Sequence, residues 1–315
     1  MSDGPTGPRH TDSPIIETRD LHKHFGQVRA LAGVDLSVPP GITGLVGANG
    51  AGKTTLIRLL LGLTAPTSGD VAVFGAPVSR DAAGLRAKIG YMPEGSCLPR
   101  DQTAADFVAY AAELAGIPPA EARRRASETL FLVGLHEERF RYLGDFSTGM
   151  QQRVKLAQSI VHDPGLVLLD EPASGLDPAG RDQMLEVIDR FRGFGMNVLF
   201  SSHLLDDIEQ TCDWVVMLDG GRLLRSAPLD PPPADGTAVS VEVFDDPLPL
   251  VAALTAAGIE VTHADRVVTA VSPTEDVFVA VRNALAASGS SIRAMGADLS
   301  SLEDVFMAAT RESNG

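Results

Sequence analysis

Short apolar runs rich in β-branched residues alternate with stretches whose apolar positions repeat at helical spacing, from Ile15 to about Ser226. This alternation is typical of a mostly parallel β-sheet covered by helices. It predicts an α/β domain over residues 15–226.

The pattern changes between residues 101 and 162, where helical spacing replaces most of the strand-like runs. Three segments carry it, namely 106–116, 118–134 and 150–162. Pro118 and Pro119 open the second segment, and proline is favoured in the first turn of a helix. A helical subdomain is therefore predicted to interrupt the sheet.

A proline-rich stretch, residues 227–236, predicts a linker, because proline lacks the backbone donor that helices and central strands need. Beyond it, over residues 237–312, the order of predicted elements is β-α-β-β-α-β. That order indicates a small α+β domain of the ferredoxin-like kind. A last helix is expected to open at Ser300, with Glu303 in capping-box spacing.

The length of 315 residues also favours two domains over one. Residues 1–14 are rich in proline, glycine and serine without an apolar core, so we expect a disordered tail rather than a signal peptide. No apolar run approaches the roughly 18 to 20 residues that span a bilayer, so the chain is not expected to cross a membrane.

Charge and cysteine content exclude several classes of protein. The formal net charge of -15 argues against nucleic acid as a partner, since a binder of phosphate backbones needs a basic face. Cys97 and Cys212 are the two cysteines, and their spacing suggests neither a disulfide nor a zinc site.

The strongest chemical signal is a glycine-rich loop between a strand-like run at 42–46 and a helical run at 55–63. Its residues are Gly47, Ala48, Asn49, Gly50, Ala51, Gly52, Lys53 and Thr54. Such a loop points backbone N–H groups at phosphate oxygens, and the helix N-terminus adds positive potential. Lys53 is expected to reach the phosphates of ATP, the Thr54 hydroxyl to ligate Mg²⁺, and Thr55 to complete the nucleotide site. A plain glycine-rich turn is the weaker alternative, because a strand and a helix flank the loop.

A second apolar run, residues 166–169, ends in Asp170 and Glu171. Sites in α/β proteins lie at the carboxyl ends of the strands. Asp170 suits a magnesium contact, and Glu171 is placed to act as general base on the water that attacks the γ-phosphate. Without the glycine-rich loop, a strand that ends in solvent would remain a weaker alternative for this pair.

The class of nucleotide-binding protein is narrowed by residues 146–153, Phe-Ser-Thr-Gly-Met-Gln-Gln-Arg. This segment resembles the signature sequence of the ATP-binding cassette (ABC) family, a P-loop NTPase family, in the form found in drug and antibiotic exporters. The resemblance implies that Ser147 and the backbone of Gly149 contact ATP held by a second subunit.

The resemblance extends over residues 15–226, with each family motif in order. It implies that Phe25 stacks on adenine, that Asp177 in the D-loop 174–177 touches the partner's site, and that His203 senses the γ-phosphate. Two positions depart from the family pattern. Glu94 stands where the family usually has Gln, and can still meet Mg²⁺ through water, while Thr148 replaces a glycine of the signature.

Function follows from this resemblance. It implies an ATPase subunit that binds ATP and Mg²⁺ and pairs head to tail with a second ATPase subunit, identical or different. The pair would drive a separate transmembrane permease from the inner face of the cell membrane, in export of a drug, antibiotic or lipid-like compound. Residues 237–310 also resemble the C-terminal domain of many exporter ATPases, particularly at 302–306.

Two alternatives remain at this point. One is a soluble ABC ATPase in translation or DNA repair, although such proteins usually carry two cassettes or a long coiled coil. The other is an importer ATPase, whose C-terminal domain would more often be a β-barrel.

Overall fold

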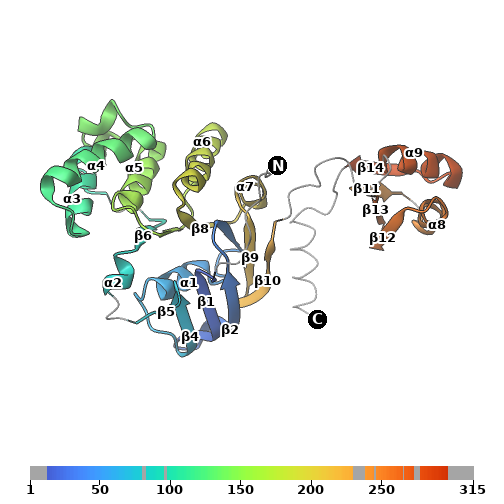
Figure 1. Ribbon diagram of the computed structural model, residues 1–315, viewed down its shortest axis with the longest axis horizontal. Helices are drawn as coiled ribbons and strands as arrows, with labels where there is room; N and C mark the ends of the chain where they lie inside the picture. Colours follow the sequence, from blue (N-terminus) through green and yellow to red (C-terminus); the bar gives the residue numbers. More distant parts are fainter. Residues whose placement is uncertain are drawn as a thin grey trace, which may run out of the picture. The chain divides into compact units, whose positions relative to one another are not determined.

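The computed structural model of the protein describes residues 13–79, 83–95, 98–229, 238–244, 246–264, 266–272 and 277–296. The chain divides into two compact units between Leu229 and Asp230 (Figure 1).

A six-stranded sheet forms the centre of the first unit, in the order β10-β9-β3-β8-β7-β6. Its strands are β3 (Ile42–Val46), β6 (Ile89–Met92), β7 (Leu166–Leu169), β8 (Asn197–Ser202), β9 (Trp214–Asp219) and β10 (Arg222–Pro228). All pair in parallel except the edge strand β10. Every residue of β3 and β7 is buried, as expected for parallel strands covered on both faces. The predicted parallel sheet is confirmed.

A second sheet of the first unit is antiparallel, in the order β2-β1-β4-β5, and the sequence pattern did not predict it. Its strands are β1 (Ile16–Phe25), β2 (Val28–Val38), β4 (Ser68–Val73) and β5 (Ala76–Pro77). Many of their residues are partly exposed, since an antiparallel sheet can face water on one side. Gly26, at a φ of 59°, lies in the tight turn between β1 and β2.

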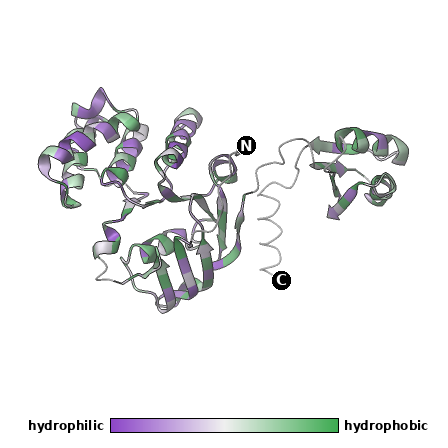
Figure 2. Ribbon diagram, viewed as in Figure 1, coloured by the Kyte–Doolittle hydropathy of each residue, from purple (hydrophilic) through white to green (hydrophobic). Residues whose placement is uncertain are grey.

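Helices α3 (Ala104–Leu114), α4 (Pro119–Leu132) and α5 (Thr148–Ile160) occupy the predicted helical region. Thr103 caps α3 by accepting a hydrogen bond from the Asp106 N–H, and Pro119 stands in the first turn of α4. All three helices mix hydrophilic and hydrophobic residues, as amphipathic helices do (Figure 2). The three predicted helices are therefore confirmed.

The remaining helices connect the sheet strands. They are α1 (Lys53–Leu60), α2 (Ala83–Arg86), α6 (Pro178–Asp189) and α7 (Leu205–Thr211), with short 3-10 turns at Glu138–Phe140, Leu143–Asp145 and Arg190–Phe194. None of the helices in the described ranges has the length and apolar character that a membrane span needs.

The second unit contains β11 (Ala238–Val243), α8 (Leu248–Ala256), β12 (Glu260–Ala264), β13 (Val267–Val271), α9 (Val277–Ser288) and β14 (Ile292–Gly296). Its antiparallel sheet has the order β12-β13-β11-β14. This is the ferredoxin-like arrangement predicted from the sequence. Val239, Val241 and Val243 alternate along β11 into a core shared with Leu250 and Leu254 of α8.

Some predictions lie outside the described residues. They include the helix at Ser300, residues 1–12 of the predicted tail and most of the predicted linker. Pro228 belongs to β10, two residues beyond the predicted end of the α/β domain. Because β10 is an edge strand paired only with β9 in the described sheet, a proline is tolerated there.

Candidate functional site

The glycine-rich loop links β3 to α1, and two of its glycines are required by close contacts. A Cβ on Gly47 would lie 2.3 Å from the carbonyl oxygen of Leu218, and Gly52 has a φ of 108° with the Ala30 carbonyl 2.7 Å from a built Cβ. No other residue type fits these positions without moving the backbone. The close approach of β9 and β2 therefore leaves room only for glycine at these two positions.

The loop and the start of α1 line a cavity of about 390 Å³. Gly52 gives α1 no side-chain cap, and no acidic residue stands in its first turn. Helix N-termini of this kind offer backbone N–H groups and positive potential to an anion. The loop residues from Ala48 to Thr55 lie on the cavity wall, together with Glu94, Glu171 and residues 28–30. The donor set fits the phosphates of a nucleotide.

Lys53 lines this cavity and is 7% exposed. Its ammonium group donates a hydrogen bond of 2.6 Å to the Gly47 carbonyl and lies 3.3 Å from Oε1 of Glu171. A buried cation beside the loop supplies the charge that a polyphosphate needs.

Thr54 and Asp170, both predicted to contact Mg²⁺, lie side by side. The Thr54 hydroxyl donates to Oδ1 of Asp170 at 3.2 Å, and the Ser201 hydroxyl donates to the same oxygen at 3.0 Å. Glu94, the third predicted metal contact, lines the same cavity. These oxygen ligands are of the type that Mg²⁺ prefers.

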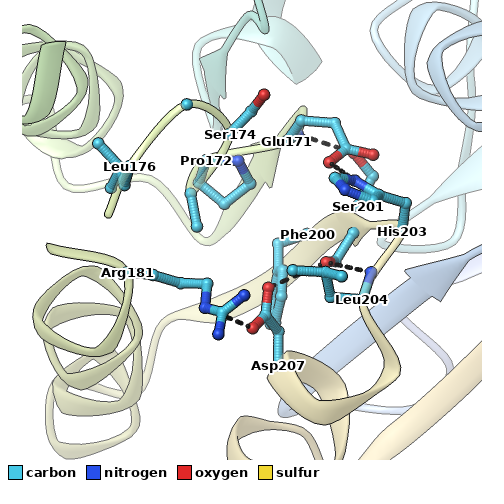
Figure 3. Close-up of a pocket in the computed structure, with 13 residues that line it drawn as sticks. Glu171, Pro172, Ser174, Leu176, Arg181, Phe200, Ser201, His203, Leu204 and Asp207 are labelled. Carbon is cyan, nitrogen blue, oxygen red and sulfur yellow. Dashed lines mark hydrogen bonds and ion pairs between the residues drawn. The ribbon is translucent and has the colours of Figure 1, made fainter. Parts of the chain in front are cut away.

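Glu171 contacts both Lys53 and His203, and Figure 3 shows its side chain next to that of His203. Its Oε1 faces Lys53, and its Oε2 is 2.9 Å from Nδ1 of His203. The backbone of Glu171 has a φ of 51°, unusual for a non-glycine residue, and its N–H donates to the Ser201 hydroxyl at 2.8 Å. Strained backbone that the surroundings hold in place is common at functional sites. The structure thus brings together the two residues predicted to be catalytic.

Ser147 and Asp177 are both helix N-caps. Ser147 accepts a hydrogen bond from the Met150 N–H at the start of α5, and Asp177 accepts one from the Gly180 N–H at the start of α6. Gly149 lies beside the D-loop, with 3.6 Å between its built Cβ and Leu176. Ser147, Gly149 and Asp177 are not among the described residues that line the 390 Å³ cavity.

Phe25 is 49% exposed and lies at the end of the β1–β2 hairpin, paired with Val28. The Lys23 ammonium is 4.8 Å from the centre of its ring. Phe25 itself is not among the lining residues of the described cavity, whereas Val28, Arg29 and Ala30 are. The hairpin therefore reaches the cavity mainly through β2.

Sequence reasoning missed several residues around the site. Ser201 contacts both Asp170 and Glu171, and buried Lys155 donates to the carbonyl oxygens of Glu94 and Gly95 at 3.0 and 3.2 Å. Residues 28–30 also belong to this group. The signal for these residues in the sequence was weak. A serine or lysine among apolar residues indicates that a polar partner is needed, but it does not identify the partner.

Comparison with known proteins identifies relatives of the first unit. The family profile described as ABC transporter matches residues 31–174. Bacitracin transport ATP-binding protein BcrA of Bacillus licheniformis is 38% identical over 220 residues, which cover 69% of this chain and 71% of BcrA. Linearmycin resistance ATP-binding protein LnrL of Bacillus subtilis is 32% identical, over 67% of this chain and 68% of LnrL.

A solved ATP-binding subunit of an ABC transporter has a similar structure. It superimposes with a TM-score of 0.61 at 30% sequence identity, and the match covers 69% of this chain and 90% of that subunit.

Proposed function

The chain belongs to the ABC transporter family, and from this premise we propose that it powers the export of an antibiotic-like compound through a separate transmembrane permease. The family hydrolyses ATP and couples hydrolysis to transport. BcrA and LnrL are named for bacitracin transport and linearmycin resistance, which supports an antibiotic-like compound as cargo. Such names do not favour a role in translation or DNA repair.

The arrangement of Glu171 carries the mechanistic part of the proposal. Its carboxylate lies 3.3 Å from Lys53 and 2.9 Å from His203, and it lines the cavity of the phosphate-binding loop. A carboxylate in that place can accept a proton from a water molecule that attacks the γ-phosphate. His203 orients the carboxylate, and Lys53 with the loop N–H groups holds the phosphates.

Thr54 and Asp170 would hold Mg²⁺, with Glu94 acting through water. The ion would neutralise charge on the phosphate oxygens. The hydrogen bond between Thr54 and Asp170 supports this assignment, because it brings two oxygen ligands to one place. Ser201 donates to Asp170 from the side and fixes the carboxylate.

A second ATPase subunit would complete the site. Ser147, Gly149 and Asp177 lie at helix N-termini away from the lining of the chain's own cavity, within the described residues. We assign them to the ATP of a partner subunit, where a helix N-terminus can bind the γ-phosphate. Phe25 is assigned to adenine, at the end of the hairpin whose next strand lines the cavity.

Glu171→Gln tests the proposal. The variant keeps the shape of the side chain but loses the base, so we expect kcat to fall at least about 100-fold while ATP still binds. We also expect a dimer that persists in ATP during size-exclusion chromatography, and a permease that copurifies with the tagged variant from solubilised membranes. Hydrolysis would be measured as phosphate release.

Glu186→Gln on the exposed face of α6 is the matched control and should hydrolyse ATP at the normal rate. Normal turnover by Glu171→Gln would show that Glu171 is not the base. Copurification with ribosomes or DNA in place of a membrane protein would contradict the proposed role in export.

A further inference from the structure

An ion pair beside the site has no role in the mechanism described above. Nε of Arg181, on α6, lies 3.4 Å from Oδ1 of Asp207, on α7. The side chain of Asp207 is only 5% exposed and that of Arg181 31%. A carboxylate so well buried needs a charged or hydrogen-bonding partner, and Arg181 is one such partner of Asp207.

Asp207 holds the turn that carries His203. The Ser202 hydroxyl donates to Oδ2 of Asp207 at 3.1 Å, and the Leu204 N–H donates to the Ser202 hydroxyl at 3.0 Å. Ser202 and Leu204 are the two neighbours of His203 in the chain. Asp207 therefore fixes both sides of the histidine that contacts Glu171.

Arg181 belongs to the opposite wall of a pocket. This pocket of about 150 Å³ is lined by residues 171–176 on one side and by residues 200–204 on the other. Arg181 lies in the first turns of α6, directly after the D-loop, and its side chain points across toward Asp207 (Figure 3). The ion pair thus connects the segment that follows Glu171 with the turn that carries His203.

The charge of Asp207 depends on these contacts. The pKa of the Asp207 carboxyl is raised above its ordinary value by burial, and the hydrogen bond from Ser202 and the positive charge of Arg181 partly oppose this effect. Nε of Arg181 is buried and has no hydrogen-bond partner among the described residues. Its distance from Asp207 exceeds that of an ordinary charge-assisted hydrogen bond, so a small movement of α6 toward α7 would strengthen the contact.

We propose that Arg181 is a positioning residue for ATP hydrolysis, which acts through Asp207 and Ser202 to hold His203 against Glu171. The inference rests on the roles of Glu171 and His203 in the proposed function. Neither Arg181 nor Asp207 lines the described part of the 390 Å³ nucleotide cavity. The ion pair therefore acts on turnover and not on ATP binding.

A double-mutant cycle on the full-length chain tests this inference, with kcat and KM for ATP measured in the presence of Mg²⁺. Arg181→Gln and Asp207→Asn should each lower kcat about tenfold and change KM by less than about threefold. The double variant should be no slower than the slower single variant. Arg181→Lys keeps the positive charge and should retain kcat within about threefold of the original chain.

Arg192→Gln is the matched control, because Arg192 also makes ion pairs, with Asp189 and Asp213, away from this pocket. It should leave kcat unchanged. The thermal midpoint of each variant shows that it is folded, and Asp207→Asn retains the shape of the side chain.

Unchanged kcat in both single variants, effects that multiply in the double variant, or equal loss in Arg181→Lys and Arg181→Gln would each overturn the inference. Glu171→Gln in the same assay distinguishes a failure of the proposed function from a failure of the role inferred for Arg181. If it hydrolyses ATP normally, the proposed function fails; if it is inactive while the Arg181 variants are normal, only this inference fails.

Discussion

Ser201 connects the two acidic residues of the site from the neighbouring strand. Its hydroxyl donates to Asp170 at 3.0 Å and accepts the Glu171 N–H at 2.8 Å, and the residue is fully buried. One hydroxyl therefore fixes both the side chain of a predicted metal ligand and the strained backbone of the predicted base.

Ser201→Ala should lower the free energy of unfolding by about 1–3 kcal/mol, since it leaves the buried Glu171 N–H without its acceptor. It should also lower kcat about tenfold, because the Glu171 backbone and the Asp170 side chain lose a common support. Urea unfolding and phosphate release measure the two effects.

Ser159→Ala provides the comparison, because Ser159 is equally buried but donates within its own helix, to the Leu156 carbonyl. We expect it to alter stability without altering kcat. Equal kcat values for both alanine variants would show that the Ser201 hydroxyl does not contribute to ATP hydrolysis.

Functional residues that belong to a motif within one continuous segment could be predicted from the sequence. The phosphate-binding loop and the Asp170–Glu171 pair each follow an apolar run. In the structure Glu171 lines the cavity of the loop, and Asp170 accepts a hydrogen bond from Thr54. Ser201 was not predictable, because its contacts depend on the register of β7 against β8, in which Leu169 pairs with Phe200. A pairing between strands about 30 residues apart cannot be deduced from local pattern.

At the scale of elements, α5 links the signature segment to the segment that contains Glu94. Ser147 caps the helix, and Lys155, two turns later and 3% exposed, donates to the carbonyl oxygens of Glu94 and Gly95. One helix thus begins at the signature residues Ser147 to Gly149 and, through Lys155, contacts the segment whose Glu94 lines the nucleotide cavity.

Lys155→Met should lower the free energy of unfolding by about 1–3 kcal/mol, because methionine fills the space of the lysine stem but cannot donate to the two carbonyl groups. Lys88→Met, at an exposed lysine, should change it by less than about 0.5 kcal/mol. Urea unfolding of the two variants under identical conditions gives the comparison. Similar losses in both would mean that the carbonyl contacts of Lys155 contribute little.

Helices were more predictable than sheets in this chain. The helical spacing of apolar residues in α3, α4 and α5 can be recognised within each segment. Thr103 caps α3, Pro119 stands in the first turn of α4, and Ser147 caps α5. The antiparallel sheet of β1, β2, β4 and β5 was missed, because the alternation of strands and helices over residues 15–226 predicted one mostly parallel sheet. Which strands pair, and in which direction, depends on contacts distant in sequence.

At the scale of the whole molecule, the two units have separate apolar cores. One contains residues such as Leu45, Leu56 and Leu168, and the other is built from residues of 239–284. In the proposed function, nucleotide binds to the first unit, in the cavity of the phosphate-binding loop. A ligand stabilises the structure to which it binds, so the two units should respond differently to nucleotide and to core substitutions.

Calorimetry of the full-length chain should therefore resolve two unfolding transitions. ADP, which is not hydrolysed further at the site, should raise the midpoint of one transition, with a stabilisation of about 2.7 kcal/mol at 100 times its Kd. Leu254→Ala, at a fully buried position of α8, should destabilise the other by about 2–5 kcal/mol and leave the ADP-sensitive midpoint in place. A single transition that both changes move would show instead that the units unfold together, and the second unit would then contribute directly to the stability of the ATPase site.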